Sequence, residues 1–185
     1  MSIYGGFRPI RHVTGAPYNG QANRYEHPAA DGTALFVGDI VKLDSAAADT
    51  VDGTPAVIAA TAGDVPIGVI VGIDPVLTNL ASLNVAASTK QYVYVCDDPG
   101  IVMAVASSGT LAASDMAKTA NLLASTAGST TLGLSGMLLN EADVGTSTHT
   151  FLLERLYLDN TNALGASGVV EVSFNAHAKK STPGV

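Results

Sequence analysis

The fold is decided by a stretch that contains Ile67-Gly68-Val69-Ile70-Val71-Gly72-Ile73, Tyr92-Val93-Tyr94-Val95-Cys96 and Ile101-Val102-Met103-Ala104-Val105. These runs are short, rich in β-branched residues and without a helical period, so each predicts a strand. Gly, Pro and Asp separate them, as in Asp97-Asp98-Pro99-Gly100, which predicts a hairpin turn. Further apolar runs precede them at residues 35–37, 40–43 and 56–58. Short strands at this spacing predict an all-β sandwich or barrel.

The last third of the sequence returns to strand patterns, at residues 134–139, 151–158 and 169–174. In the last of these, three apolar residues alternate with Glu171 and Ser173, which is typical of a half-buried strand. Residues 107–131, rich in Ser, Thr, Ala and Gly, predict a connection. Within it, residues 115–123 have a weak helical spacing with Ser114 as candidate N-cap, and a loop is the alternative. Residues 76–90 fit either one helical turn or a covering loop.

The charges are unevenly distributed along the 185 residues, whose net charge is −7. Residues 1–25 contain three arginines and no acid, whereas residues 26–178 contain sixteen acids and four basic residues. A nucleic-acid-binding body would be basic, so we expect no nucleic-acid partner. The acidic loop with Asp44, Asp49 and Asp52 lacks the ligand spacing of an EF-hand and predicts a solvated turn.

Residues 1–30 combine Gly and Pro with four of the ten aromatic residues. Disordered tails are poor in aromatics, whereas interfaces favour Tyr and Arg. The segment is therefore interpreted as an extended N-terminal arm that orders against a partner; an arm folded back onto its own β domain is the alternative. The candidate partner-binding residues are Tyr4, Phe7, Arg8, Arg11, Tyr18, Arg24 and Tyr25.

No catalytic or metal-binding motif is found in the sequence. The four histidines and Cys96, the single cysteine, have no zinc-ligand spacing. Cys96 lies in a strand and predicts a buried core residue, and a single cysteine fits assembly in a reducing cytoplasm. We expect no enzyme, cofactor or metal. The longest apolar run, residues 65–73, is too short for a membrane helix, and we expect no membrane partner.

Several segments together resemble the capsid cement (head decoration) proteins of tailed bacteriophages. Gly6-Phe7-Arg8-Pro9-Ile10-Arg11 and Ala16-Pro17-Tyr18-Asn19-Gly20 are similar to the family's opening segment. The first β domain and the C-terminal part are matched by Asp31-Gly32-Thr33-Ala34-Leu35-Phe36-Val37-Gly38-Asp39, Gly68-Val69-Ile70-Val71-Gly72, Gly128-Ser129-Thr130-Thr131-Leu132-Gly133-Leu134-Ser135 and the ending from Asn162-Ala163-Leu164-Gly165 to His177. Each motif is short, and their order along most of the chain carries the resemblance.

The resemblance implies a jelly-roll or β-tulip-like protein on the outer face of an icosahedral phage capsid, assembled in the host cytoplasm. Its partners would be the major capsid protein and further copies of itself, as a homotrimer or, second, a dimer. The expected division is an arm (1–30), a main β domain (31–106), a connection (107–131) and C-terminal strands (132–185), which complete the fold or form a small second lobe and end in a short basic tail. A head fibre or receptor-binding virion protein and, more remotely, a soluble β-domain enzyme are the alternative functions.

Overall fold

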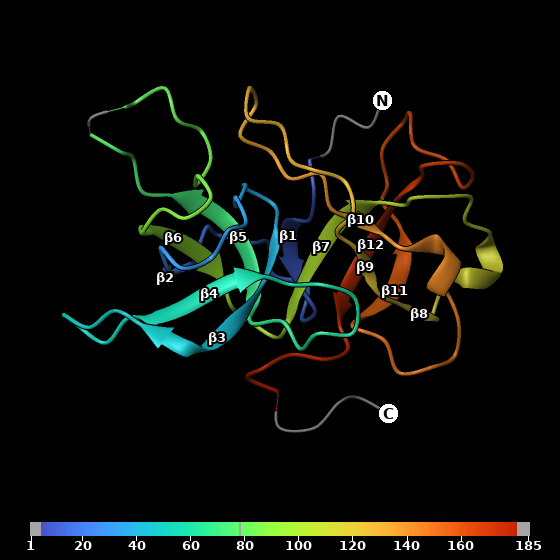
Figure 1. The fold of residues 1–185 in the computed structure, drawn as a ribbon. Helices are drawn as coiled ribbons and strands as arrows, with labels where there is room; N and C mark the ends of the chain where they lie inside the picture. The colour runs from blue at the N-terminus through green and yellow to red at the C-terminus, as the bar shows by residue number, and fades with distance from the viewer. Residues whose placement is uncertain (1–4, 78, 181–185) are drawn as a thin grey trace.

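The computed structural model describes residues 5–77 and 79–180, and it confirms an all-β protein. Figure 1 shows two β units that lie against each other, a barrel and a separate sheet. In the described ranges, the helical structure consists of two 3-10 turns of three residues each, η1 (Ala113–Asp115) and η2 (Glu141–Asp143). The same ranges contain no helix with the length and apolar character needed to cross a membrane.

The barrel closes in the order β2-β4-β3-β5-β6, and β2 returns to pair with β6. Its neighbours are antiparallel except for the parallel pair of β2 and β4. The interior is filled by apolar side chains from all five strands and from three residues outside them: Tyr25, Leu35, Val41, Val57, Ile67, Ile70, Val85, Val93 and Val95. The strands are β2 (Asn23–His27), β3 (Ile40–Ala48), β4 (Pro55–Ala59), β5 (Gly68–Ile73) and β6 (Gln91–Cys96).

The second unit is a five-stranded antiparallel sheet in the order β1-β7-β12-β11-β8. Its strands are β1 (Arg8–His12), β7 (Ile101–Ala106), β8 (Thr119–Ala120), β11 (Phe151–Leu156) and β12 (Val169–Phe174). A small two-stranded sheet of β9 (Leu122–Leu123) and β10 (Leu138–Leu139) lies beside it. All residues of β7 and β12 are buried, because these two strands lie between others and are covered on both faces.

The main core lies between the sheet and the outer wall of the barrel. Successive strand residues point to opposite faces, so Ile70 points into the barrel while Val69 packs against the sheet. On β6, Val95 points into the barrel and Cys96 packs against the sheet. This two-sided burial explains why β5 is a continuous apolar run instead of an alternating one. Gly68 is required where β5 meets β6, since a Cβ there would lie 2.2 Å from the Cys96 carbonyl oxygen.

The expected extended arm is not what the structure shows. Residues 8–12 form the edge strand β1, paired with β7, and residues 23–27 form β2, which closes the barrel. Phe7 is 1% exposed, and its ring stacks on Phe151 with centroids 4.7 Å apart. The segment therefore adopts the alternative and folds back onto its own chain. The physical reason is that its aromatic residues fill the chain's own two cores.

Other details differ from the sequence prediction more locally. Residues 97–100 form the predicted turn but no hairpin, because β6 belongs to the barrel and β7 to the sheet. β1 and β7 pair in one sheet with the C-terminal strands β11 and β12, which complete that sheet. In the described part, residues 76–90 form a loop without a helix, in which Val85 is buried but Leu77 and Leu80 are exposed. Ser114 lies inside η1, whose N-cap is Ala112.

Candidate functional site

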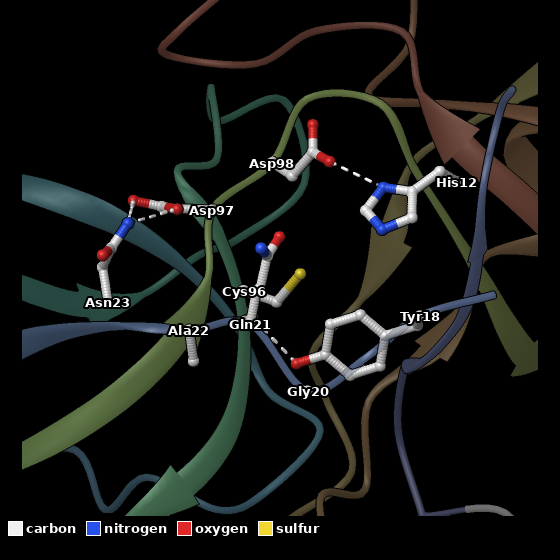
Figure 2. A pocket seen from close by; sticks show the side chains of 9 residues that line it. All are labelled: His12, Tyr18, Gly20, Gln21, Ala22, Asn23, Cys96, Asp97 and Asp98. Atoms are coloured by element: carbon white, nitrogen blue, oxygen red, sulfur yellow. Dashed lines mark hydrogen bonds and ion pairs between the residues drawn. The ribbon is translucent and has the colours of Figure 1, made fainter. Parts of the chain in front are cut away.

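A polar cavity of about 450 Å³ lies where the barrel meets the sheet, and Figure 2 shows its lining side chains. Three segments build it: the end of β1, the stretch that leads into β2, and the turn between β6 and β7. The turn lies at the junction of barrel and sheet, because the chain leaves the barrel at the end of β6 and enters the sheet at the start of β7. The lining residues are His12, Tyr18, Gly20, Gln21, Ala22, Asn23, Cys96, Asp97 and Asp98.

Asp97 is the hub of this cavity. Its carboxylate accepts hydrogen bonds from Asn23 Nδ2 at 2.9 Å and from the Tyr25 hydroxyl at 2.7 Å, and it forms an ion pair with Lys179. Burial acts to raise the pKa of Asp97, but the donors from Lys179, Tyr25 and Asn23 outweigh burial and hold the pKa below its usual value. The carboxylate thus joins the barrel to the C-terminal segment.

His12 and Asp98 form the second polar pair. His12 Nδ1 lies 2.8 Å from Asp98 Oδ2, so this nitrogen donates its hydrogen to the carboxylate. The other carboxylate oxygen of Asp98 accepts the Gly100 N–H at 2.7 Å, and the Val13 N–H donates to the Gly100 carbonyl at 2.8 Å. The pair therefore fixes the β6–β7 turn against the end of β1.

Cys96, His12 and Asp98 line one cavity, which is the residue set of a cysteine hydrolase. A nucleophilic cysteine needs a lowered pKa, whereas burial raises the pKa of the Cys96 thiol. Burial and the neighbouring Cys96 also raise the pKa of Tyr18 to about 12, so its hydroxyl stays protonated. That hydroxyl donates to the Gln21 carbonyl at 2.9 Å. The Tyr18 contact holds the loop, and burial opposes formation of the Cys96 thiolate.

Three of the predicted partner-binding residues meet at a second hollow. Phe7, Arg8 and Tyr18 line a mainly apolar groove of about 350 Å³ between β1 and β5, together with Leu134. Phe7 is buried at its base, whereas Arg8 is exposed and its Nη2 lies 3.3 Å from the Tyr157 hydroxyl. The structure thus brings these three together, with one in the core and one at the surface.

The other predicted residues are separated from this groove. Arg11 is paired with the buried carboxylate of Glu171 at 2.7 Å on the sheet. Arg24 forms an exposed ion pair with Asp52 at 2.5 Å on the barrel. Tyr25 is 6% exposed and points into the barrel core, so in this conformation neither it nor Phe7 offers surface to a partner. Tyr4 lies outside the described residues.

A charged cluster on the barrel was missed by sequence reasoning. Asp49, expected in a solvated turn, is 3% exposed, and its carboxylate accepts a hydrogen bond from the Tyr92 hydroxyl. Lys90 Nζ lies 3.1 Å from Asp49 and 3.3 Å from Glu26. The Tyr92 bond, followed by the Val51 N–H, holds the pKa of Asp49 far below its usual range. The only sequence signal was the alternation of Tyr92 with Val93, which places Tyr92 on the barrel's outer face.

No group of His, Cys, Asp and Glu side chains among residues 5–77 and 79–180 could hold a metal ion. The comparisons with known proteins identify no relative: no family model matches the chain, and neither a curated protein nor a solved structure does. The class that fold and site define is therefore an all-β protein whose polar cavity holds two β units together.

Proposed function

We propose that this chain is a structural protein of a tailed-phage head, which binds the outer capsid surface and cements neighbouring major capsid protein subunits. One observation carries the proposal: the polar groups of the cavity bind to one another and connect parts of the chain that are far apart in sequence. Asp97 joins residues 23, 25 and 179, and Asp98 joins residues 12 and 100. A cement protein needs such rigidity, whereas an enzyme needs groups that remain available to a substrate.

The resemblance in motif order supplies the identity of the partner. Under this proposal, the barrel and sheet together are the family's jelly-roll or β-tulip-like fold, and the chain acts as a homotrimer or, second, a dimer. Many copies on one shell provide avidity, so each capsid contact can be modest.

The structure divides the proposed contact residues by exposure. Arg8 and Arg24 have exposed side chains, and we assign them the charge-assisted hydrogen bonds to coat carboxylates or carbonyls. Arg11 already binds the buried Glu171, and Phe7 and Tyr25 are core residues, so these three support the fold that presents the contact.

The experiment is to add purified protein to undecorated phage heads and to measure occupancy by electron microscopy. We expect binding at defined lattice positions and higher resistance to heat. Arg8→Ala/Arg24→Ala should lower occupancy, whereas Lys118→Ala, which removes a cation paired locally with Asp115 at 2.9 Å, should not. Absence of wild-type binding would overturn the function. Wild-type binding with full occupancy by the double variant would overturn the assignment of Arg8 and Arg24 alone.

A further inference from the structure

Four leucines project from two surface loops of the protein. Leu77, Leu80 and Leu83 belong to the loop between β5 and β6 and are 87%, 70% and 49% exposed. Leu132 belongs to the loop between β9 and β10 and is 65% exposed. We call these four residues the leucine face. In Figure 1 both loops, green and golden, project from the same side of the molecule. Exposed apolar residues that gather in this way mark interaction sites.

The two loops are held together by backbone contacts, so the leucine face is one surface. Leu35 exchanges two hydrogen bonds with Val85 of the first loop, at 3.0 and 2.9 Å. Val37, two residues on, accepts from Ser135 and donates to Gly133 of the second loop. Gly133, with φ +68°, lies directly on Leu83, since a Cβ there would be 2.4 Å from the Leu83 carbonyl oxygen.

Both loops lack charged residues over most of their length, and in the first loop the charges are Asp74 and Lys90 at its two ends. Residues 75–89 and residues 119–140 contain no Asp, Glu, Lys, Arg or His. The second range is 22 consecutive residues in a chain with 25 charged residues, 9 basic and 16 acidic, among 185. Depletion of charge together with large apolar side chains is the composition of an interface core.

We infer that the leucine face is the contact between two copies of this chain. Two copies, each with a net charge of −7, repel each other over most of their surface. A neutral apolar face is where this repulsion is smallest, and it is complementary to itself, as the two-fold contact of the dimer requires. The charge pattern therefore favours a second copy over a partner with a charged surface, which would need complementary charges here.

The inference rests on the self-association within the proposed function and does not depend on the capsid partner. It is tested on the purified full chain, so its failure is distinguishable from a failure to bind heads. Exposed leucines also contribute little to the fold of one copy, so substitution should leave folding intact.

The experiment is analytical ultracentrifugation of wild type, Leu80→Glu/Leu132→Glu and the control Leu158→Glu. Leu158 is 76% exposed but lies on another loop, after β11. We expect wild type and control to form the same oligomer at micromolar concentrations. The double variant should sediment as a folded 18.7 kDa monomer, with its dissociation constant raised at least about a hundredfold.

Added salt should strengthen the wild-type association or leave it unchanged, because salt screens the repulsion between acidic bodies. If ion pairs held the interface, added salt would weaken the association instead. A monomeric wild type at high micromolar concentration overturns the inference, as does an oligomer that survives the double substitution. Equal loss in the double variant and in Leu158→Glu also overturns it. A monomer that binds heads through the leucine face would identify the coat as the occupant.

Discussion

Arg11 Nη2 lies 2.7 Å from Glu171 Oε2, and this contact joins the first strand of the chain to the last. β7 lies between these two strands, and its residue Ala104 pairs with Glu171 in register. A small residue at that position leaves room for the guanidinium to reach across. Arg155, on the other neighbouring strand, approaches the same carboxylate at 3.0 Å. The buried charge of Glu171 is therefore balanced from both sides.

Arg11→Ala should destabilise the fold by about 1–3 kcal/mol, because Glu171 is 5% exposed and would lose one of its two cationic partners. Urea unfolding followed by circular dichroism measures this loss. Arg24→Ala is the matched control: its ion pair with Asp52 is 44% and 41% exposed, and its loss should cost only about 0–1 kcal/mol. Equal losses in the two variants would show that burial does not decide the strength of these pairs.

Phe7→Ala should destabilise the protein by about 3–5 kcal/mol, the cost of removing a fully buried aromatic ring. Phe7 stacks on Phe151, which in turn packs on Phe174 with centroids 5.5 Å apart, so the cavity opens in the main core. Thermal unfolding is the measurement.

Deletion of residues 1–27 should prevent folding, since it removes β1 and opens the barrel at β2. A folded truncated protein would restore the extended-arm hypothesis.

β5 and β7 could be predicted from sequence because they are apolar along their whole length, and β6 because Tyr and Val alternate in it. The runs at residues 67–73, 92–96 and 101–105 became β5, β6 and β7 within one residue. Apolar, β-branched runs of that length are too short for a core helix and favour buried strands. The division of strands between barrel and sheet was not predictable, since it depends on pairings between residues far apart, such as Arg8 with Ala104.

The extended conformation expected for residues 1–30 was the main error in the prediction, since residues 8–12 and 23–27 form paired strands. An interface arm and a strand that supplies internal ion pairs are both rich in arginine, tyrosine and glycine. Composition therefore does not distinguish them. Only the position of Glu171, 160 residues away from Arg11, distinguishes the two. The cavity was partly visible, because Asp97 and Asp98 were recognised as a turn. Their partners Lys179 and His12 lie at opposite ends of the sequence and carried no local signal.

Asp39 should make the protein more stable as the pH falls from 7 toward about 4.5. Burial raises the pKa of Asp39 to about 6, although hydrogen bonds from Ser135 and the Phe36 N–H lower it. The unfolded chain binds this proton only near pH 4, so between these pH values the folded state binds more protons. Full protonation should add on the order of 2 kcal/mol.

The measurement is the free energy of unfolding against pH for wild type and Asp39→Asn. The variant should lose the contribution of Asp39 between pH 7 and 4.5. In both proteins stability should fall below pH 6.5 through His177, whose pKa is lowered by burial, and fall further at lower pH. The further fall comes from carboxylates whose pKa values are lowered in the fold, so their contribution is lost only below their unfolded pKa near 4. They are Asp49, Asp52, Asp64, Asp97 and Asp115. Identical pH profiles for the two proteins would contradict the role of Asp39.

Cys96 should react slowly with iodoacetamide in the folded protein. The residue is 2% exposed, and burial raises the pKa of its thiol, so both access and thiolate formation are unfavourable. Labelling then requires local opening, and it should be slower than in urea by at least about two orders of magnitude. Mass spectrometry against time measures the rate.

His12→Ala is the decisive variant. If His12 activates the thiol, its removal should make labelling slower. We expect no slowing, because burial is the main cause of the raised pKa of the Cys96 thiol and Tyr18 is its side-chain hydrogen-bond partner. Rapid native labelling that falls in His12→Ala would instead identify a Cys–His nucleophile and would replace the structural function by an enzymatic one.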